Sequence, residues 1–131
     1  MSEAQKIDSE KLAAFCVAEA ENKLAENIVS IKVSAQTTIA DYFILCTANN
    51  DPHINAIVNN IERQVRDEFK LRPLSVDGDA ASGWILIDFG MVIVHVMTEE
   101  CRARYRLESL WSELPSLDDL ENAAIKANLK N

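Results

Sequence analysis

The stretch from Trp84 to Met97 reads WILIDFGMVIVHVM and predicts a β-hairpin. Two runs rich in β-branched residues lie on either side of Gly90, and glycine is favoured in tight turns between strands. Successive side chains of a strand point to opposite faces of its sheet, so the second run should divide into two sets. One set comprises Val92, Val94 and Val96, and the other comprises Ile93, His95 and Met97.

The predicted turn contains Asp88-Phe89-Gly90, the tripeptide with which protein kinases hold magnesium against ATP phosphates. A kinase domain also needs a Gly-rich loop, a strand lysine and a catalytic loop, and it needs far more chain than these 131 residues. None of those motifs occurs in the sequence. We therefore interpret this tripeptide as the turn of a hairpin and not as part of a phosphoryl-transfer site.

Two amphipathic helices are predicted before the hairpin. The first should begin at Asp8 or Ser9, whose side chains can cap free amides, and the second should have Asp51 as its cap and Pro52 at its first position. The apolar face of the first helix comprises Leu12, Phe15, Cys16, Ala20 and Leu24. That of the second comprises Ile54, Ile57, Val58, Ile61, Val65 and Phe69. The opposite, solvated face of the second helix comprises Asn55, Asn59, Asn60, Glu62, Arg63 and Arg66.

The remaining segments complete a mixed α/β pattern. Residues 27–34 alternate as a strand, and residues 39–48 are almost continuously apolar, as in a central strand covered on both faces. A short strand and a turn-rich segment should precede the hairpin, and Thr98 should cap a helix through residues 101–111. A final helix from Ser116 is also expected. The order α-β-β-α-β-β-β-α implies helices covering a mainly antiparallel sheet with some parallel pairing.

Length predicts one domain over residues 1–131, with a core at 8–112 and a helix or tail at 113–131. The formal charge of −8 disfavours generic nucleic-acid binding, and it either steers a basic protein partner or only keeps the chain soluble. Three dispersed cysteines predict reduced thiols, with Cys16 and Cys46 in the core. Because the first residues have no targeting character and no window approaches a membrane span, we expect a cytoplasmic protein.

Catalytic and metal-binding constellations are not evident. Four carboxylates are the plausible metal donors: Asp41, Asp77, Asp79 and Asp88. The segment around Asp77 and Asp79 lacks the downstream acid of a calcium loop, so we interpret both as solvated turn residues. His53 and His95 are too few for a zinc site, and neither has a spaced nucleophile. We expect no enzyme activity, cofactor or metal, with a residual nucleotide-binding enzyme as the rival hypothesis.

Aromatic residues near polar segments are the better candidates for function. Trp84 opens the hairpin after a Gly-containing loop, and it either packs on the sheet or anchors a protein partner. A patch around it could be continued by Met97, Arg102, Arg104, Tyr105 and Arg106. We expect Trp111 to belong to the core.

Longer blocks of the sequence resemble a known family. They read ADYFILCTANNDPHINAIVNNIE and RPLSVDGDAASGWILIDFGMVIVHVMTEECRARYRLESLW. With their spacing, over about Leu12 to Ser112, they are similar to the ribosomal silencing factor family, also called RsfS or Iojap. The most specific block is G-W-x-x-x-D-x-G-x-V-x-V-H-V.

This resemblance implies a fold related to nucleotidyltransferases but without their catalytic carboxylates, and a role that is not enzymatic. It implies binding to the large ribosomal subunit through ribosomal protein uL-fourteen, on the face that meets the small subunit. Such binding would block subunit joining and repress translation when nutrients are scarce; some relatives act in organelle ribosome assembly, so a large-subunit assembly factor is an alternative. The contact residues carried over from the motif are Trp84, Ile85, Asp88, His95, Met97, Arg102 and Tyr105.

Two departures from the family pattern stand out. Thr47-Ala48-Asn49-Asn50 replaces the usual Thr-Gly-x-Ser after the central strand, which puts any role of that turn in doubt. Gly90-Met91 replaces Gly-Asp in the hairpin turn, which adds an apolar side chain that could serve a homodimer contact.

Overall fold

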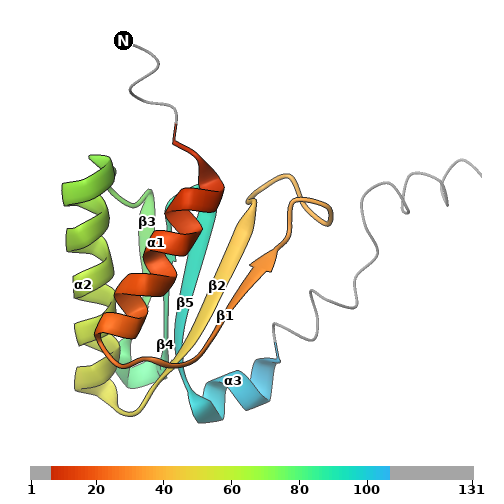
Figure 1. The fold of residues 1–131 in the computed structure, drawn as a ribbon. Coiled ribbons are helices and arrows are strands. Elements are labelled where there is room, and N and C mark those ends of the chain that lie inside the picture. Colours follow the sequence, from red (N-terminus) through yellow and green to blue (C-terminus); the bar gives the residue numbers. More distant parts are fainter. Residues whose placement is uncertain (1–6, 107–131) are drawn as a thin grey trace, which may run out of the picture.

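The computed structural model describes residues 7–106, and its elements follow the predicted order (Figure 1). The helices are α1 (Ser9–Asn22), α2 (Asp51–Phe69) and α3 (Glu99–Tyr105), with a short 3-10 helix η2 (Ala80–Ser82). The strands are β1 (Glu26–Lys32), β2 (Tyr42–Ala48), β3 (Ser75–Asp79), β4 (Trp84–Asp88) and β5 (Val92–Thr98). Trp111, the expected helix from Ser116 and the segment 113–131 lie outside the described residues.

A single five-stranded sheet has the order β1-β2-β5-β4-β3. Only the central pair, β2 and β5, runs parallel, and the three other pairings are antiparallel. The predicted mixed sheet is therefore confirmed. The central position of β2 explains its nearly continuous apolar run. Both faces of this strand are covered, so its side chains are buried on either side of the sheet.

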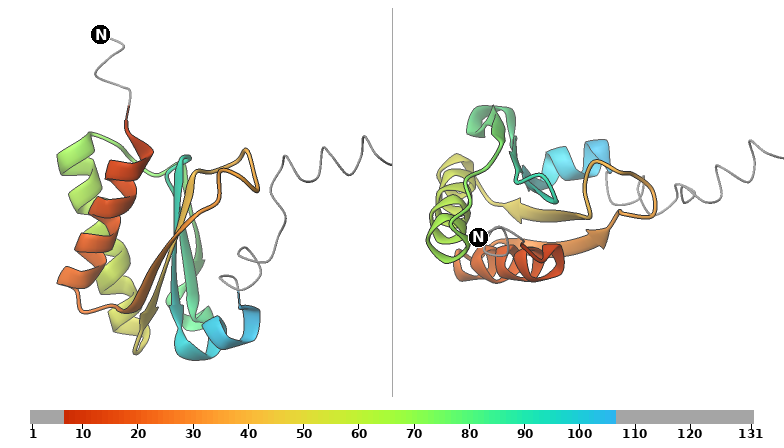
Figure 2. Two further views of the ribbon diagram at one scale, coloured as in Figure 1. Left: turned by 45° about the vertical axis from the view of Figure 1, so that its right-hand side comes forward. Right: turned by 90° about the horizontal axis from the view of Figure 1, so that it is seen from above.

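Helices α1 and α2 cover one face of the sheet (Figure 2). The residues packed under them include most of the predicted helical stripes and the three alternating valines of β5. Phe15 of α1 meets Phe69 of α2 edge to face, with ring centroids 5.2 Å apart, and this contact joins the two helices near their outer surface. This helical face carries most of the core.

The second face of the sheet has a smaller core, formed by Val33, Ala40, Phe43, Leu45, Ile93 and Met97. Figure 2 shows α3 on the side of the sheet opposite α1. Because α3 contains only seven residues, it reaches only one end of this face. Trp84 and Leu86 pack against this smaller core and are only partly buried. The second face therefore remains partly open to solvent beside these two side chains.

The turn of the β4–β5 hairpin is built as the sequence predicts. Gly90 has φ +91°, a left-handed conformation that glycine adopts without strain. The carboxylate of Asp88 accepts a hydrogen bond of 2.7 Å from the Gly90 amide, which closes the turn. Met91 is partly buried against the helical-face core, so its apolar side chain contributes to packing within this chain.

The start of α2 is shifted by one residue from the prediction. Asn50, not Asp51, is the cap, since its side-chain oxygen accepts a 2.8 Å hydrogen bond from the His53 amide. Asp51 then becomes the first helical residue, where its charge favours the positive helix end. Asn50 stands where the family pattern has serine, and an asparagine caps a helix as well as a serine does, so the altered turn keeps a structural role.

Two side chains were assigned to the wrong environment. Leu24 is 77% exposed because α1 ends at Asn22, two residues before it. Asn60 is buried, although it was placed on the solvated face of α2. Its amide donates hydrogen bonds to the backbone oxygen and the carboxylate of Glu19, at 3.1 and 3.0 Å, so it joins α2 to α1.

Candidate protein-binding site

Four aromatic rings gather on the second face of the sheet, and we call them the aromatic cluster: Phe43, Trp84, His95 and Tyr105. The register places them, because Trp84 pairs with Met97 and Leu86 pairs with His95, which makes Trp84 and His95 diagonal neighbours. The centroids of Trp84 and Tyr105 are 5.0 Å apart, and those of Phe43 and His95 are 5.1 Å apart. The sheet and α3 thus bring together a continuous group of rings, of which Phe43 and His95 are buried and Trp84 and Tyr105 are accessible.

His95 lies at the centre of this cluster and is 4% exposed. Its Nδ1 accepts a 3.2 Å hydrogen bond from Nε1 of Trp84, whose ring centroid is 5.9 Å away. Because Nδ1 accepts, the proton of the neutral ring is on Nε2, and Nε2 has no hydrogen-bond partner among the described residues. Burial lowers the pKa of His95 to about 4, so the ring is neutral at physiological pH.

A hollow of about 340 Å³ opens beside the cluster, and we call it the Trp84 hollow. Its lining is mostly apolar and comprises Asp77, Gly78, Ser82, Trp84, Leu86, Cys101 and Tyr105. Gly78 allows β3 to approach β4 closely beside the hollow, because a Cβ at this position would clash with the Trp84 carbonyl oxygen. Tyr105 is 49% exposed at the rim, so a partner can reach the aromatic surface from solvent.

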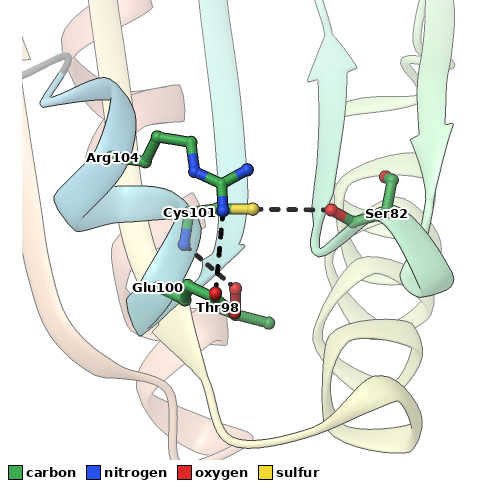
Figure 3. Close-up of polar contacts among 5 residues, drawn as sticks. All are labelled: Ser82, Thr98, Glu100, Cys101 and Arg104. Carbon is green, nitrogen blue, oxygen red and sulfur yellow. Dashed lines mark hydrogen bonds and ion pairs between the residues drawn. The ribbon is translucent and has the colours of Figure 1, made fainter.

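Helix α3 borders the hollow and is held near its N-terminal end (Figure 3). The Thr98 hydroxyl accepts a 3.2 Å hydrogen bond from the Cys101 amide, which confirms Thr98 as the predicted cap. The Cys101 thiol contacts the Ser82 carbonyl oxygen at 3.4 Å, and Glu100 pairs with Arg104 at 3.6 Å on the solvent side. The thiol contact ties α3 to η2 across the hollow.

Arg102 points from α3 into the protein and is buried. Its guanidinium donates hydrogen bonds to the Asn27 carbonyl oxygen at 2.5 Å and to the Thr47 hydroxyl at 3.0 Å. These bonds join α3 to β1 and β2. The described geometry therefore gives Arg102 a structural task, whereas the neighbouring Arg104 is exposed.

The seven predicted contact residues occupy different places. Trp84, His95, Met97 and Tyr105 come together on the second face, with Met97 fully buried beside Trp84 on the neighbouring strand. Ile85 alternates to the helical face and is buried in its core. Asp88 ends β4 at the hairpin turn, about 13 Å along the strand from Trp84. Five lining residues were not among the predicted contacts: Asp77, Gly78, Ser82, Leu86 and Cys101. The alternation of WILID could have placed Leu86 beside Trp84, but no sequence pattern brings α3 to η2.

Carboxylates do not converge on a metal position in residues 7–106. Asp77 and Asp79 were interpreted as turn residues, but they belong to strand β3, where they pair with Leu86 and Trp84. Their exposure agrees with the solvated part of that interpretation. Asp88 lies at the other end of β4, and the described residues contain no group of three His, Cys, Asp or Glu that could hold a metal ion. No helix in this part of the chain is both long and apolar enough to cross a bilayer.

A family profile described as "Ribosomal silencing factor during starvation" matches residues 6–131. The chain belongs to the ribosomal silencing factor family. It is 31% identical over 112 residues to the ribosomal silencing factor RsfS of Bacillus subtilis, covering 86% of this chain and 94% of that protein. A mouse protein named "Mitochondrial assembly of ribosomal large subunit protein 1" is 32% identical over 72% of this chain and 42% of its own. The predicted family is therefore confirmed.

Solved structures support the fold of this silencing-factor chain. A crystal structure from Bacillus halodurans is 30% identical and superposes with a TM-score of 0.68, covering 82% of this chain and 97% of that one. A second, from Chromobacterium violaceum, has a TM-score of 0.77 at 22% identity, covering 81% and 88% of the two chains. The α/β architecture predicted for the family is shown by both, and the family name describes a regulator rather than an enzyme.

We predict that buried His95 makes stability fall in mild acid. The unfolded chain binds a proton below pH 6.5 and the folded chain only below about 4, so stability is lost as the pH falls between these values. The full loss is roughly 3 kcal/mol. Denaturant titrations at several pH values should show this extra loss in wild type relative to His95→Phe, which shares the other titrating groups. Parallel curves would contradict the prediction.

A second prediction concerns the thiols. Burial raises the pKa values of Cys16 and Cys46 to about 12, so both thiols stay protonated and shielded, whereas Cys101 is partly exposed in the hollow. Mass spectrometry after brief alkylation should find Cys101 modified in the folded protein. Cys16 and Cys46 should react only after unfolding. Early modification of either buried thiol would show that the helical face opens more readily than its packing indicates.

A third prediction tests the structural role of the buried Arg102 side chain. Arg102→Ala removes its hydrogen bonds to Asn27 and Thr47 and should lower the free energy of unfolding by about 3 kcal/mol. Arg104→Ala, on the same helix but exposed, is the matched control and should change it by less than about 0.5 kcal/mol. Chemical denaturation measures both, and equal small effects would remove the structural role of Arg102.

Proposed function

We propose that this chain acts as a silencing factor in the cytoplasm. It binds the large ribosomal subunit through ribosomal protein uL-fourteen, blocks association with the small subunit and represses translation, chiefly under nutrient limitation. The mechanism is steric and needs no reaction, cofactor or metal. Family membership over residues 6–131 supports the ribosomal setting.

The observation that carries the proposal is the Trp84 hollow. It combines a half-buried tryptophan, an exposed tyrosine and a mostly apolar lining on one face of the sheet. Tryptophan and tyrosine dominate the energetics of protein interfaces, and their anchoring rings sit in pockets of this kind. A hollow of this composition favours a protein partner over a nucleic-acid backbone.

Charge supports the same class of partner. The chain carries 21 acidic and 13 basic residues, and Asp77 lies in the lining of the hollow itself. An acidic surface repels phosphate backbones and attracts basic proteins at long range. A basic ribosomal protein therefore fits, provided that the contact lies away from the surrounding RNA.

The predicted contact residues divide by placement. We assign direct contact to Trp84 and Tyr105, which are accessible at the hollow, and a supporting role to buried Met97 on the neighbouring strand. Asp88 could touch a partner only through an interface that extends to the hairpin turn. Ile85 and Arg102 would act by holding β4 and α3 in place, since both side chains are buried.

A large-subunit assembly factor is the second candidate. It is favoured by one observation, the similarity to the mouse protein whose name describes assembly of the mitochondrial large subunit. Both roles use the same binding surface but differ in timing. A silencing factor acts on mature subunits, whereas loss of an assembly factor leads to accumulation of incomplete large subunits. A homodimer through the same hollow would compete with either role.

We predict that Trp84→Ala weakens binding to large subunits by about thirtyfold, the loss of a central anchor worth about 2 kcal/mol. Purified large subunits are sedimented with increasing protein, and then small subunits are added to score joining on a sucrose gradient. Wild type should remain with large subunits and reduce joining, and Trp84→Ala should fail at both. Ile39→Ala is the control, since Ile39 is 67% exposed in a loop outside the lining of the hollow.

Normal joining at saturating wild-type protein would overturn the silencing proposal. If Trp84→Ala also lowers the thermal midpoint strongly, its failure to bind reflects lost packing, and Tyr105→Ala then tests the surface at an exposed position. Calorimetry with magnesium and nucleotides addresses the enzyme rival, which requires measurable binding.

A further inference from the structure

We infer that His95 is a positioning residue, which holds the Trp84 indole in one orientation for the partner and does not itself touch the partner. The inference rests on the proposed function of the Trp84 hollow and deepens it. Its basis is the geometry of a single hydrogen bond between a half-buried ring and a buried one.

The imidazole of His95 and the indole of Trp84 differ in burial, and only the indole is accessible to a partner. His95 is 4% exposed, covered by the Phe43 ring on one side and Trp84 on the other, and it does not line the hollow. Trp84 lines the hollow and meets Tyr105 at 5.0 Å. A partner that enters the hollow thus meets the indole first, and it could reach the imidazole only by displacing the indole.

An imidazole is an unfavourable choice for this buried position, apart from its hydrogen bond to Trp84. Its Nε2–H is buried without an acceptor among the described residues, which is unfavourable. A phenylalanine would fill the same space beside Phe43 without an unpaired donor. The interaction that the imidazole supplies here, and that a phenylalanine could not, is acceptance of the Trp84 N–H at Nδ1. The hydrogen bond to Trp84 is therefore the feature that accounts for a histidine at this position.

This bond also determines what a partner can recognise. Because the indole N–H is already donated to His95, Trp84 offers its ring surface and not a hydrogen bond. The bond also fixes the angle of the ring, which removes a conformational choice before binding. Fixing an anchor in its bound orientation raises affinity by lowering the entropy lost on association. Without the acceptor, the indole N–H would turn to water and the wall of the hollow would move.

The test is a double-mutant cycle on binding to large subunits. His95→Phe removes the acceptor and keeps a ring; Trp84→Phe removes the donor and keeps an aromatic anchor. Each should weaken binding about three- to tenfold, and the double variant should be no weaker than the worse single variant. His95→Asn, whose side-chain oxygen can stand near the position of Nδ1, should restore most of the affinity. Losses that multiply in the double variant would overturn the inference, because His95 would then act independently of Trp84.

A readout on the free protein separates this inference from the proposed function. The indole N–H resonance of Trp84, identified by its absence in Trp84→Phe, should exchange slowly with solvent in wild type and in His95→Asn, and faster in His95→Phe. Equal exchange in all three proteins would overturn the hydrogen-bond role even if ribosome binding holds. Slow exchange in wild type without any ribosome binding would retain the fixed indole orientation and refute the silencing function.

Discussion

The parallel pairing of β2 with β5 is the constraint on which the rest of this structure depends. It places the two most apolar strands side by side at the centre of the sheet, where both faces must be covered. The valines of β5 then pack under α1 and α2, while Ile93, His95 and Met97 are directed to the second face. A single strand thus contributes to the main core and to the support of the candidate site, so the site cannot shift without disturbing the core.

The two faces of the sheet are covered by helices to different extents, and the candidate site lies on the less covered face. Two long helices seal one face, whereas α3 reaches only one end of the other. Where α3 meets η2, the Cys101 thiol hydrogen-bonds to the Ser82 carbonyl oxygen, and both residues line the hollow. At the adjacent edge, β3 is exposed along its whole length and carries Asp77 and Asp79. Charged side chains on an edge strand oppose unspecific strand pairing, so the exposed edge is protected beside a surface that stays open.

Sequence patterns predicted the elements well because most of them follow from periodicity. The alternation in β5 correctly divided its side chains between the two faces of the sheet, and the helical stripe of α2 correctly identified the buried apolar residues of that helix. The predictions failed where hydrogen bonds of polar side chains determine burial or the start of a helix. Asn60 looked like a surface residue because its partner, Glu19, is 41 positions away, and the competition between Asn50 and Asp51 for the cap depends on backbone angles that the letters do not contain.

The candidate site was less predictable than the fold for the same reason. Trp84 and Tyr105 could be selected by residue type, but Arg102 looked equally suitable, and only the tertiary structure directs it to Asn27 and Thr47. Ile85 was chosen for its proximity to Trp84 in sequence, although neighbours along a strand face opposite ways. Residues that lie two apart on one strand, or diagonally across a pair, share a surface. Trp84, Leu86 and His95 are related in this manner, and the alternation rule could have joined them before the structure was known.

The balance between charge and apolar surface gives the fold its functional character. A net charge of −8 produces repulsion between copies of this chain, which would oppose self-association through the exposed aromatic rings. The same negative charge would attract a basic partner and speed its association. The apolar side chains of that partner could then be buried in the hollow. Specificity then arises from two requirements that a partner must meet together: positive charge at long range and an apolar group at contact. Neither an RNA backbone nor a second copy of this acidic chain meets both, which is the physical argument for a basic protein at the Trp84 hollow.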